Sequence, residues 1–178
     1  ERYRIPEADW ASVYLTIGDF HRGDFDAALA RARQGADDAQ RARFVVLQHR
    51  WQWVTVLIAG EQGAWSAVED TLASAAAGFD AAGEAEHAGG VRNMLADYHT
   101  IMGEPHDAWA EQHRAMLTLP SSSESRRQPI LVQSAQMALE DGWARAALAF
   151  QRQAEAGMAQ RGASVALAFV RSAIASTY

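Results

Sequence analysis

Three histidines recur at seven-residue intervals, His99, His106 and His113, and imidazole is a common metal ligand in proteins. Gly103 separates the first from the other two, so a turn there leaves only His106 and His113 on one helical face. The sequence also lacks the His-Glu-x-x-His pattern, which sets two imidazoles and a general base on one helix. We therefore predict no metal site and no cofactor.

The residue types that most enzymes use as nucleophiles or phosphate ligands are sparse in this chain. Cysteine and lysine are both absent, which excludes thiolate chemistry, Schiff bases and lysine-dependent phosphate loops. Serine, histidine and aspartate are present, but no Gly-x-Ser-x-Gly turn and no glycine-rich phosphate-binding turn occurs. We predict that the chain is not an enzyme.

Charge and hydropathy narrow the range of partners. Asp and Glu outnumber Arg by 22 to 16, and the net charge of −6 repels nucleic acid, so no direct nucleic-acid binding is expected. No apolar run approaches the ~18 residues of a membrane span, and the first residues lack signal-peptide character. The chain begins without Met and ends within an apolar helical pattern. We expect a cytoplasmic segment of a longer polypeptide, without membrane contact.

Four glycines recur at a nearly fixed interval: Gly23, Gly63, Gly103 and Gly142 are separated by 40, 40 and 39 residues. Five and twelve positions after each of them stands a small residue, with Val68 as the largest. Repetition at about 20 to 50 residues is typical of helical solenoids. A glycine that ends a helix adopts the left-handed conformation at little cost, and small residues let the next helix cross closely. The pattern predicts helix pairs with their corners at these glycines.

Apolar residues at intervals of three and four predict the helices between the corners. The expected helices span residues 9–20, 25–36, 41–59, 65–82, 84–102, 105–119, 128–140, 143–160 and 163–178. They form one domain, 1–178, with repeats at 8–38, 39–83, 84–119 and 127–161 and a half repeat at 163–178. Asp24 is suited to cap the helix after it, the four prolines fall at expected boundaries, and 120–125 is the longest expected loop. Without a partner, the last helix is expected to expose apolar surface.

The corner sequences resemble tetratricopeptide repeats. Gly23-Asp24-Phe25 with Ala28-Leu29 reproduces the glycine, acidic, aromatic and alanine pattern of that family, and the segment around Gly103 gives the second-best copy. The usual period is ~34 residues, and the longer interval here is similar to the variant found in many bacterial regulatory proteins. HEAT-type repeats share the longer period, but the glycine corner argues against them. The resemblance implies an all-α fold: a right-handed α-solenoid of about four antiparallel helix pairs plus an unpaired C-terminal helix.

The resemblance also implies a concave groove, lined by the first helix of each pair, that holds a peptide or a helix. The positions that match the groove of the family are Trp10, Val13, Ile17, Arg50, Trp53, Leu57, Asn93, Asp97 and Gln136. Asn93 is the only asparagine in the chain. The lysines with which related domains clamp a carboxylate are missing, and Arg50 is their possible substitute. The alternatives are that Arg50 is solvated or paired within the protein and that Trp53 belongs to the core, since Trp51 and Trp53 cannot share one helix face.

We therefore expect a non-catalytic adaptor or sensor module that binds a protein or peptide and belongs to a larger bacterial regulatory or signalling protein. Two alternatives from other classes remain open. The chain is either a structural oligomerisation arm, with a homodimer formed through residues 163–178, or a regulatory domain that senses a small molecule.

Overall fold

The computed structural model describes residues 6–65, 68–119, 123–162 and 170–175. These residues form helices and turns and no β-strand, so the predicted all-helical class is confirmed. The chain divides into two compact units, Glu1–Val91 (unit 1) and Arg92–Tyr178 (unit 2), and each is described by itself.

Unit 1 contains four complete helices and the beginning of a fifth. They are α1 (Pro6–His21), α2 (Phe25–Ala42), α3 (Val45–Glu61), α4 (Val68–Ala81) and the first turns of α5 (Ala85–Met102). Each of α1, α2 and α3 packs on the next helix, and α1 also packs on α3. This is the contact pattern of stacked helix pairs, in which the first helices of consecutive pairs are neighbours.

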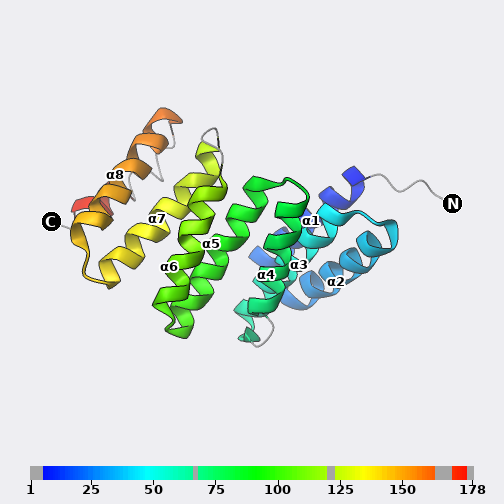
Figure 1. Ribbon diagram of the computed structural model, residues 1–178. Coiled ribbons are helices and arrows are strands. Elements are labelled where there is room, and N and C mark those ends of the chain that lie inside the picture. The colour runs from blue at the N-terminus through cyan, green and yellow to red at the C-terminus, as the bar shows by residue number, and fades with distance from the viewer. Residues whose placement is uncertain (1–5, 66–67, 120–122, 163–169, 176–178) are drawn as a thin grey trace. The chain divides into compact units, whose positions relative to one another are not determined.

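Unit 2 is also built of helices that pack on their neighbours in the chain. The rest of α5 is followed by α6 (Pro105–Thr118), α7 (Glu124–Glu140) and α8 (Ala144–Gln160), and residues 170–175 are again helical. Helix α7 packs on α6 and on α8 (Figure 1). Gln112 of α6 is fully buried between the helices, where its Nε2 donates to the carbonyl oxygen of Ile130 at 2.7 Å and to Ser134 Oγ at 3.0 Å.

The four glycine corners are confirmed. Gly23, Gly63, Gly103 and Gly142 all have positive φ angles, of 81°, 74°, 75° and 76°. In this left-handed region any residue with a Cβ is strained, so the corner itself selects glycine. At the Gly103 corner, the backbone N–H of Glu104 donates to the His99 carbonyl oxygen at 2.8 Å. This hydrogen bond closes the turn at the end of α5.

The small residues at the fifth and twelfth positions after each corner lie in the interior of the protein. All eight positions are buried: Ala28, Gly35, Val68, Ala75, Ala108, Ala115, Ala147 and Ala154. At Gly35 of α2 the indole ring of Trp51 in α3 packs so tightly that a Cβ on Gly35 would lie 2.2 Å from Trp51 Cε2. The spacing of five and twelve residues therefore marks buried positions, as predicted, but the close contact at Gly35 is with the first helix of the next pair rather than with α1.

The boundary between α2 and α3 differs from the prediction. Residues 41 and 42 were assigned to the first helix of the second repeat, but α2 continues through Ala42 and α3 begins only at Val45. The chain turns at Arg43, whose φ of 59° is left-handed. Because a non-glycine residue occupies this corner, the residue type gave no sign of it.

Within the predicted helix 65–82, residues 66 and 67 lie outside the described residues, and α4 is described from Val68. Three further expectations need correction. Helix α7 begins at Glu124, so that Pro129 lies inside a helix instead of at its start. Asp24 occupies the N-cap position of α2, but its side chain makes no capping hydrogen bond. Of the predicted loop 120–125, residues 120–122 lie outside the described residues, Ser123 is the N-cap of α7, and 124–125 are helical.

The expected last helix is described only over residues 170–175, and residues 163–169 and 176–178 of that prediction lie outside the described residues. Val170 is buried in a cluster with Leu131, Ala154 and Met158, and Ile174 packs against the same cluster. The described part of this helix thus covers apolar surface of α7 and α8.

Candidate functional site

Two of the predicted groove residues in unit 1 contact each other directly. The guanidinium carbon of Arg50, on α3, lies 3.9 Å from the ring centroid of Trp10, on α1, which is cation–π geometry. Arg50 is only 7% exposed. A second contact fixes the other side of the guanidinium, where Nη1 lies 2.7 Å from Nε2 of His87 on α5. We call Trp10, Arg50, Trp53 and His87 the Arg50 cluster.

His87 is the centre of this cluster. Because a guanidinium can only donate, Nε2 of His87 accepts from Arg50, and the proton of the neutral ring is on Nδ1, which donates to Glu84 Oε2 at 3.0 Å. The ring stacks on Phe79 at 5.1 Å and meets the edge of Trp53 at 6.5 Å. Arg50 is therefore engaged within the protein, which was one of the two interpretations of this residue.

The repeat period explains why these residues meet. Trp10 and Arg50 are 40 residues apart, which is the interval between the corner glycines, so they occupy equivalent places on adjacent first helices. Arg50 and His87 are 37 residues apart, close to the same interval. His87 was not predicted from the sequence. The repeat period nevertheless indicates that a partner of Arg50 lies about one period further along the chain.

The other groove candidates of unit 1 differ in burial. Val13 is fully buried in the core with Trp51 and Ile58, so it presents no surface to a ligand. Ile17 packs against the same core and is partly buried, as is Leu57 on α3. Trp51 is fully buried while Trp53 is partly exposed, which confirms that the two indoles face different sides of α3.

In unit 2, α5 carries two predicted groove residues one helical turn apart, Asn93 and Asp97. Both are partly exposed, and Oδ1 of Asn93 is buried without a hydrogen-bond donor among the described residues. Burial raises the pKa of the Asp97 carboxyl to about 6, because the charged form loses hydration there. Within the described part of the chain neither side chain has a hydrogen bond or ion pair that offsets this loss.

Gln136, the groove candidate on α7, is exposed, and its Nε2 donates to Glu140 Oε1 at 2.7 Å. It lines a cleft of about 230 Å³ between α7, α8 and the described part of the last helix. Val132, Leu139, Gln151 and Val170 are among the other lining residues. The cleft combines apolar walls with glutamine amides, a lining suited to an extended peptide.

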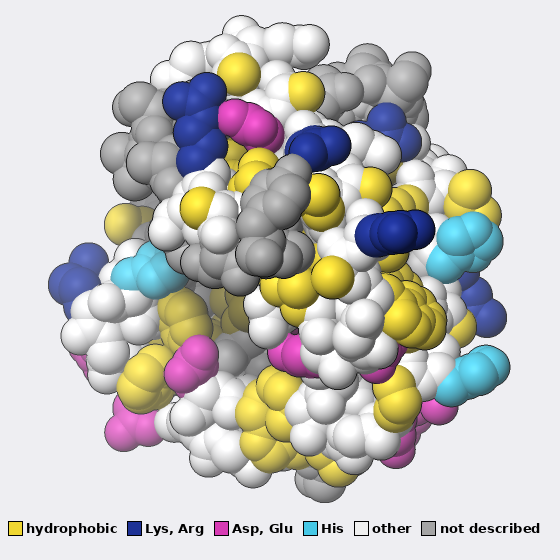
Figure 2. All heavy atoms as spheres, turned by 90° about the vertical axis from the view of Figure 1, so that its left-hand side faces the viewer, with side chains coloured by type: hydrophobic (Ala, Val, Ile, Leu, Met, Phe, Trp, Pro, Cys, Tyr) yellow, Lys and Arg dark blue, Asp and Glu magenta, His cyan; other side chains and the backbone are white. Residues whose placement is uncertain are grey.

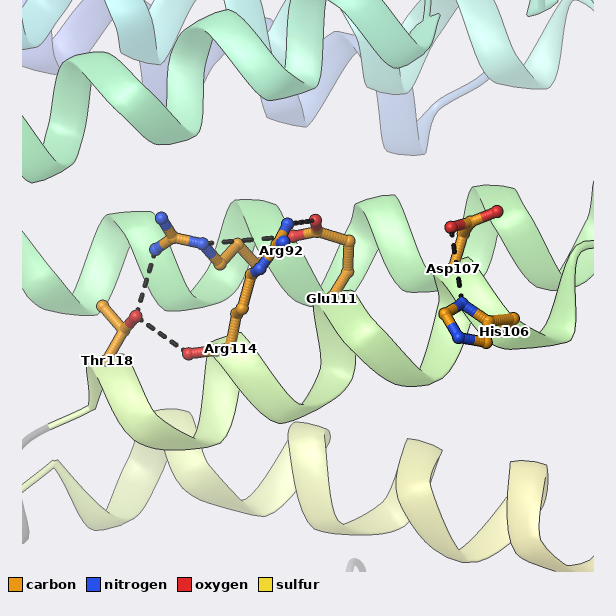
Figure 3. Close-up of polar contacts among 6 residues, drawn as sticks. All are labelled: Arg92, His106, Asp107, Glu111, Arg114 and Thr118. Carbon is orange, nitrogen blue, oxygen red and sulfur yellow. Dashed lines mark hydrogen bonds and ion pairs between the residues drawn. The ribbon is translucent and has the colours of Figure 1, made fainter.

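A polar network joins α5 to α6 in unit 2 (Figure 3). Arg92 Nη1 donates to Thr118 Oγ1 at 3.1 Å, and Arg92 Nε lies 4.0 Å from Glu111 Oε2. Glu111 also pairs with Arg114, and Thr118 Oγ1 donates to the Arg114 carbonyl oxygen at 2.8 Å. Every member has a partner inside the network, so these contacts hold the two helices together. His106 and Asp107 lie near the opposite end of α6 in the same view.

The histidines at seven-residue intervals lie on two helices, His99 at the end of α5 and the other two on α6. His99 Nδ1 donates to Glu104 Oε2 at 2.8 Å across the Gly103 corner. Donor atoms of His99, Glu104 and Asp107 lie within 4.8 Å of one another, a set of ligand types that divalent metals bind. The His99–Glu104 hydrogen bond and the helix N-terminus beside Asp107 account for all three positions without a metal.

Comparison of the sequence with protein-family models and with curated proteins gives no match. Within the described residues, no helix combines the length and the apolar character that crossing a lipid bilayer demands.

Proposed function

We propose that this chain is a non-catalytic module, a tetratricopeptide-like repeat segment of a larger regulatory or signalling protein, that binds a protein or peptide along the first helices of its pairs. The fold supports this proposal because the four corners predicted from the sequence keep the glycine and the buried small residues on which the resemblance depends. We propose a cytoplasmic and bacterial setting on the same resemblance.

The observation that carries the proposal is the pair of acceptors on α5. Oδ1 of Asn93 is buried and the Asp97 carboxyl is partly buried, and neither accepts a hydrogen bond from a donor among the described residues. A buried acceptor without a donor costs about 1–3 kcal/mol, which a ligand N–H recovers on binding. Backbone amides and basic side chains of an extended peptide supply such donors.

The described part of unit 2 offers further support. The cleft at Gln136 lies on α7, the next first helix after α5, and it provides apolar walls for side chains of the same peptide. The described part of the last helix is packed against α7 and α8, so no observation favours the oligomerisation arm over this proposal.

The proposal is tested by selection from a random peptide library displayed on phage, with the whole chain as bait. The affinity of each enriched peptide is then measured by fluorescence anisotropy. We expect the double variant N93A/D97N to bind at least about 10-fold more weakly, the loss of roughly one or two hydrogen bonds to a partly buried site.

Leu117→Ala is the matched control, because Leu117 is 73% exposed on α6 of the same unit. Circular dichroism of each variant establishes that the helices are intact. Failure to enrich any peptide, or equal affinity of enriched peptides for the double variant and the control, contradicts the proposal.

A further inference from the structure

Two tryptophans form an aromatic surface at the corners of unit 2. Trp143 directly precedes α8 and is 54% exposed, which is unusual for so large an apolar side chain. Its ring stacks on Trp109 of α6, with centroids 5.5 Å apart and an angle of 26° between the planes. The ring of Phe150 of α8 lies on Trp109 in a tilted arrangement, with centroids 6.4 Å apart. We call Trp109 and Trp143 the tryptophan shelf.

A carboxylate holds the shelf in place. Trp109 Nε1 donates to Asp141 Oδ2 at 2.6 Å, and Asp141 directly follows α7 beside the Gly142 corner. Three elements, α6, the α7–α8 corner and the start of α8, therefore fix the two rings. A surface so constrained loses little conformational entropy when a ligand binds to it.

The shelf is bordered by two hollows that share Trp109 and Asp141. The smaller one, of about 220 Å³, is also lined by Thr100, Met137 and Glu140. The larger and more open one, of about 630 Å³, is lined by His106, His113 and Trp143. No arginine is among the residues that line either hollow.

The chemistry of this surface is aromatic and acidic. Glu140 and Asp141 are both exposed beside the rings, and Glu104 and Asp107 are exposed at the neighbouring Gly103 corner. Figure 2 shows, on the side that is at the left of Figure 1, Asp and Glu side chains mostly in the lower half of the view and Arg side chains mostly in the upper half. Exposed carboxylates beside aromatic rings repel anions and attract a cation that also has an apolar face.

We propose that the tryptophan shelf binds the arginine side chain of a partner peptide, with the guanidinium stacked on an indole face and paired with Asp141 or Glu140. Arginine fits better than lysine because its planar guanidinium stacks on aromatic rings and is weakly hydrated, whereas an ammonium is compact and strongly hydrated. The two rings of the shelf lie on α6 and at the α7–α8 corner. Asn93 and Asp97, which carry the groove proposal, lie on α5 and line neither hollow beside the shelf.

The test is an NMR titration of the indole N–H signals of the six tryptophans. Tryptophan-to-phenylalanine variants assign the signals of Trp109 and Trp143. The probe is a short, blocked glycine peptide with one central arginine, and the matched peptide carries citrulline, which keeps the shape of arginine but has no charge. We expect the signals of Trp109 and Trp143 to shift with a dissociation constant on the order of 1 mM, since a single cation–π and ion-pair contact is weak.

We expect the citrulline peptide to bind at least about 10-fold more weakly than the arginine peptide. Asp141→Asn keeps an acceptor for Trp109 but removes the charge, and it should weaken binding of the arginine peptide by about 5-fold or more. Asp26→Asn, an exposed carboxylate of α2, is the control and should change nothing. Raising the salt from about 50 to about 500 mM should also weaken binding. Equal responses to arginine and citrulline, shifts spread over all six indoles, or no shift at the Trp109 and Trp143 signals would overturn the proposal. N93A/D97N leaves this titration unchanged, so loss of groove binding and loss of the arginine site are separable.

Discussion

Replacing Gly35 by alanine should destabilise unit 1, although alanine is the better helix former. A Cβ on Gly35 would lie 2.2 Å from Cε2 and 2.4 Å from Cζ2 of Trp51. Carbon atoms in contact settle at about 3.5–4.0 Å, so the indole must retreat by more than about 1 Å. Trp51 is fully buried and has no solvent to move into.

Over-packing of a core costs about 1–3 kcal/mol, and the fully enclosed ring places this site near the upper end. Alanine recovers about 1 kcal/mol of helix propensity, which leaves a net loss of about 2 kcal/mol in the free energy of unfolding. For a chain of this length that corresponds to a fall of roughly 4–8 °C in the melting temperature, followed by circular dichroism at 222 nm.

Gly18→Ala is the matched control for the Gly35 prediction. A Cβ at Gly18 of α1 meets only Arg22 Nη1, at 3.6 Å, so this substitution should raise stability by about 0.5–1 kcal/mol. Adding Trp51→Phe to Gly35→Ala should reveal a favourable coupling of about 1 kcal/mol or more, because the smaller ring relieves the clash. If Gly35→Ala melts at or above the wild-type temperature, the close crossing of α2 and α3 is refuted.

Five further substitutions, at two corners, at Asp97 and at Gln112, have defined outcomes. Arg43→Gly should raise the free energy of unfolding by about 1 kcal/mol, because Arg43 is held at a left-handed φ of 59°. Gly83→Ala should lower it by a similar amount, because Gly83 has a φ of 74° that strains a residue with a Cβ. Urea denaturation measures both changes. Burial raises the pKa of Asp97 from its usual value of 3.8 to about 6, so its contribution to stability is full below pH 4 and is lost as the pH rises through 6. Asp97→Asn should therefore gain about 1–2 kcal/mol over wild type at pH 7, allowing for partial exposure, and nothing at pH 4, whereas a pH-independent difference contradicts the assignment. Gln112→Ala should cost about 2–4 kcal/mol in thermal denaturation, through a cavity and lost hydrogen bonds, and Gln112→Met only about 1, because methionine restores the volume.

The corners and crossings could be predicted because each imposes a local demand on one residue type. A left-handed φ selects glycine, and a close helix crossing selects alanine or glycine, so both leave a mark at fixed positions in every repeat. The corner at Arg43 was not predicted, because it has the left-handed φ angle but no glycine. Its position was nevertheless encoded in the period, since it lies 40 residues before Gly83, which turns in the same way.

The start of α7 could not be predicted from hydrophobic periodicity. Its first turn, from Glu124, is polar, and Pro129 stands where a helix boundary is the usual interpretation. Residue type alone does not say that the helix has already begun five residues earlier. Only the packing of the buried Gln128 and Ile130 that follow fixes the register of this helix.

At the site, the positions of the first helices predicted Trp10, Arg50 and Trp53 but not His87, which contacts all three. The tryptophan shelf was not predicted, because Trp109 and Trp143 belong to a second helix and a corner. Their approach depends on how consecutive pairs pack, which no local pattern in one pair encodes. Exposed tryptophan beside a corner glycine was the one available signal, as Gly142-Trp143.

The state of Arg50 decides what kind of ligand the first-helix face can recognise. A free guanidinium there would favour a peptide carboxylate, which was the reason to consider Arg50 a substitute for the missing clamp lysines. Its burial, its stacking on Trp10 and its hydrogen bond to His87 commit it to the protein instead. The groove atoms that lack an offsetting partner in the described chain, Asn93 Oδ1 and the Asp97 carboxyl, are acceptors. A ligand for this face is therefore expected to present donors, and peptides enriched on it should be rich in basic side chains rather than end in a recognised carboxylate.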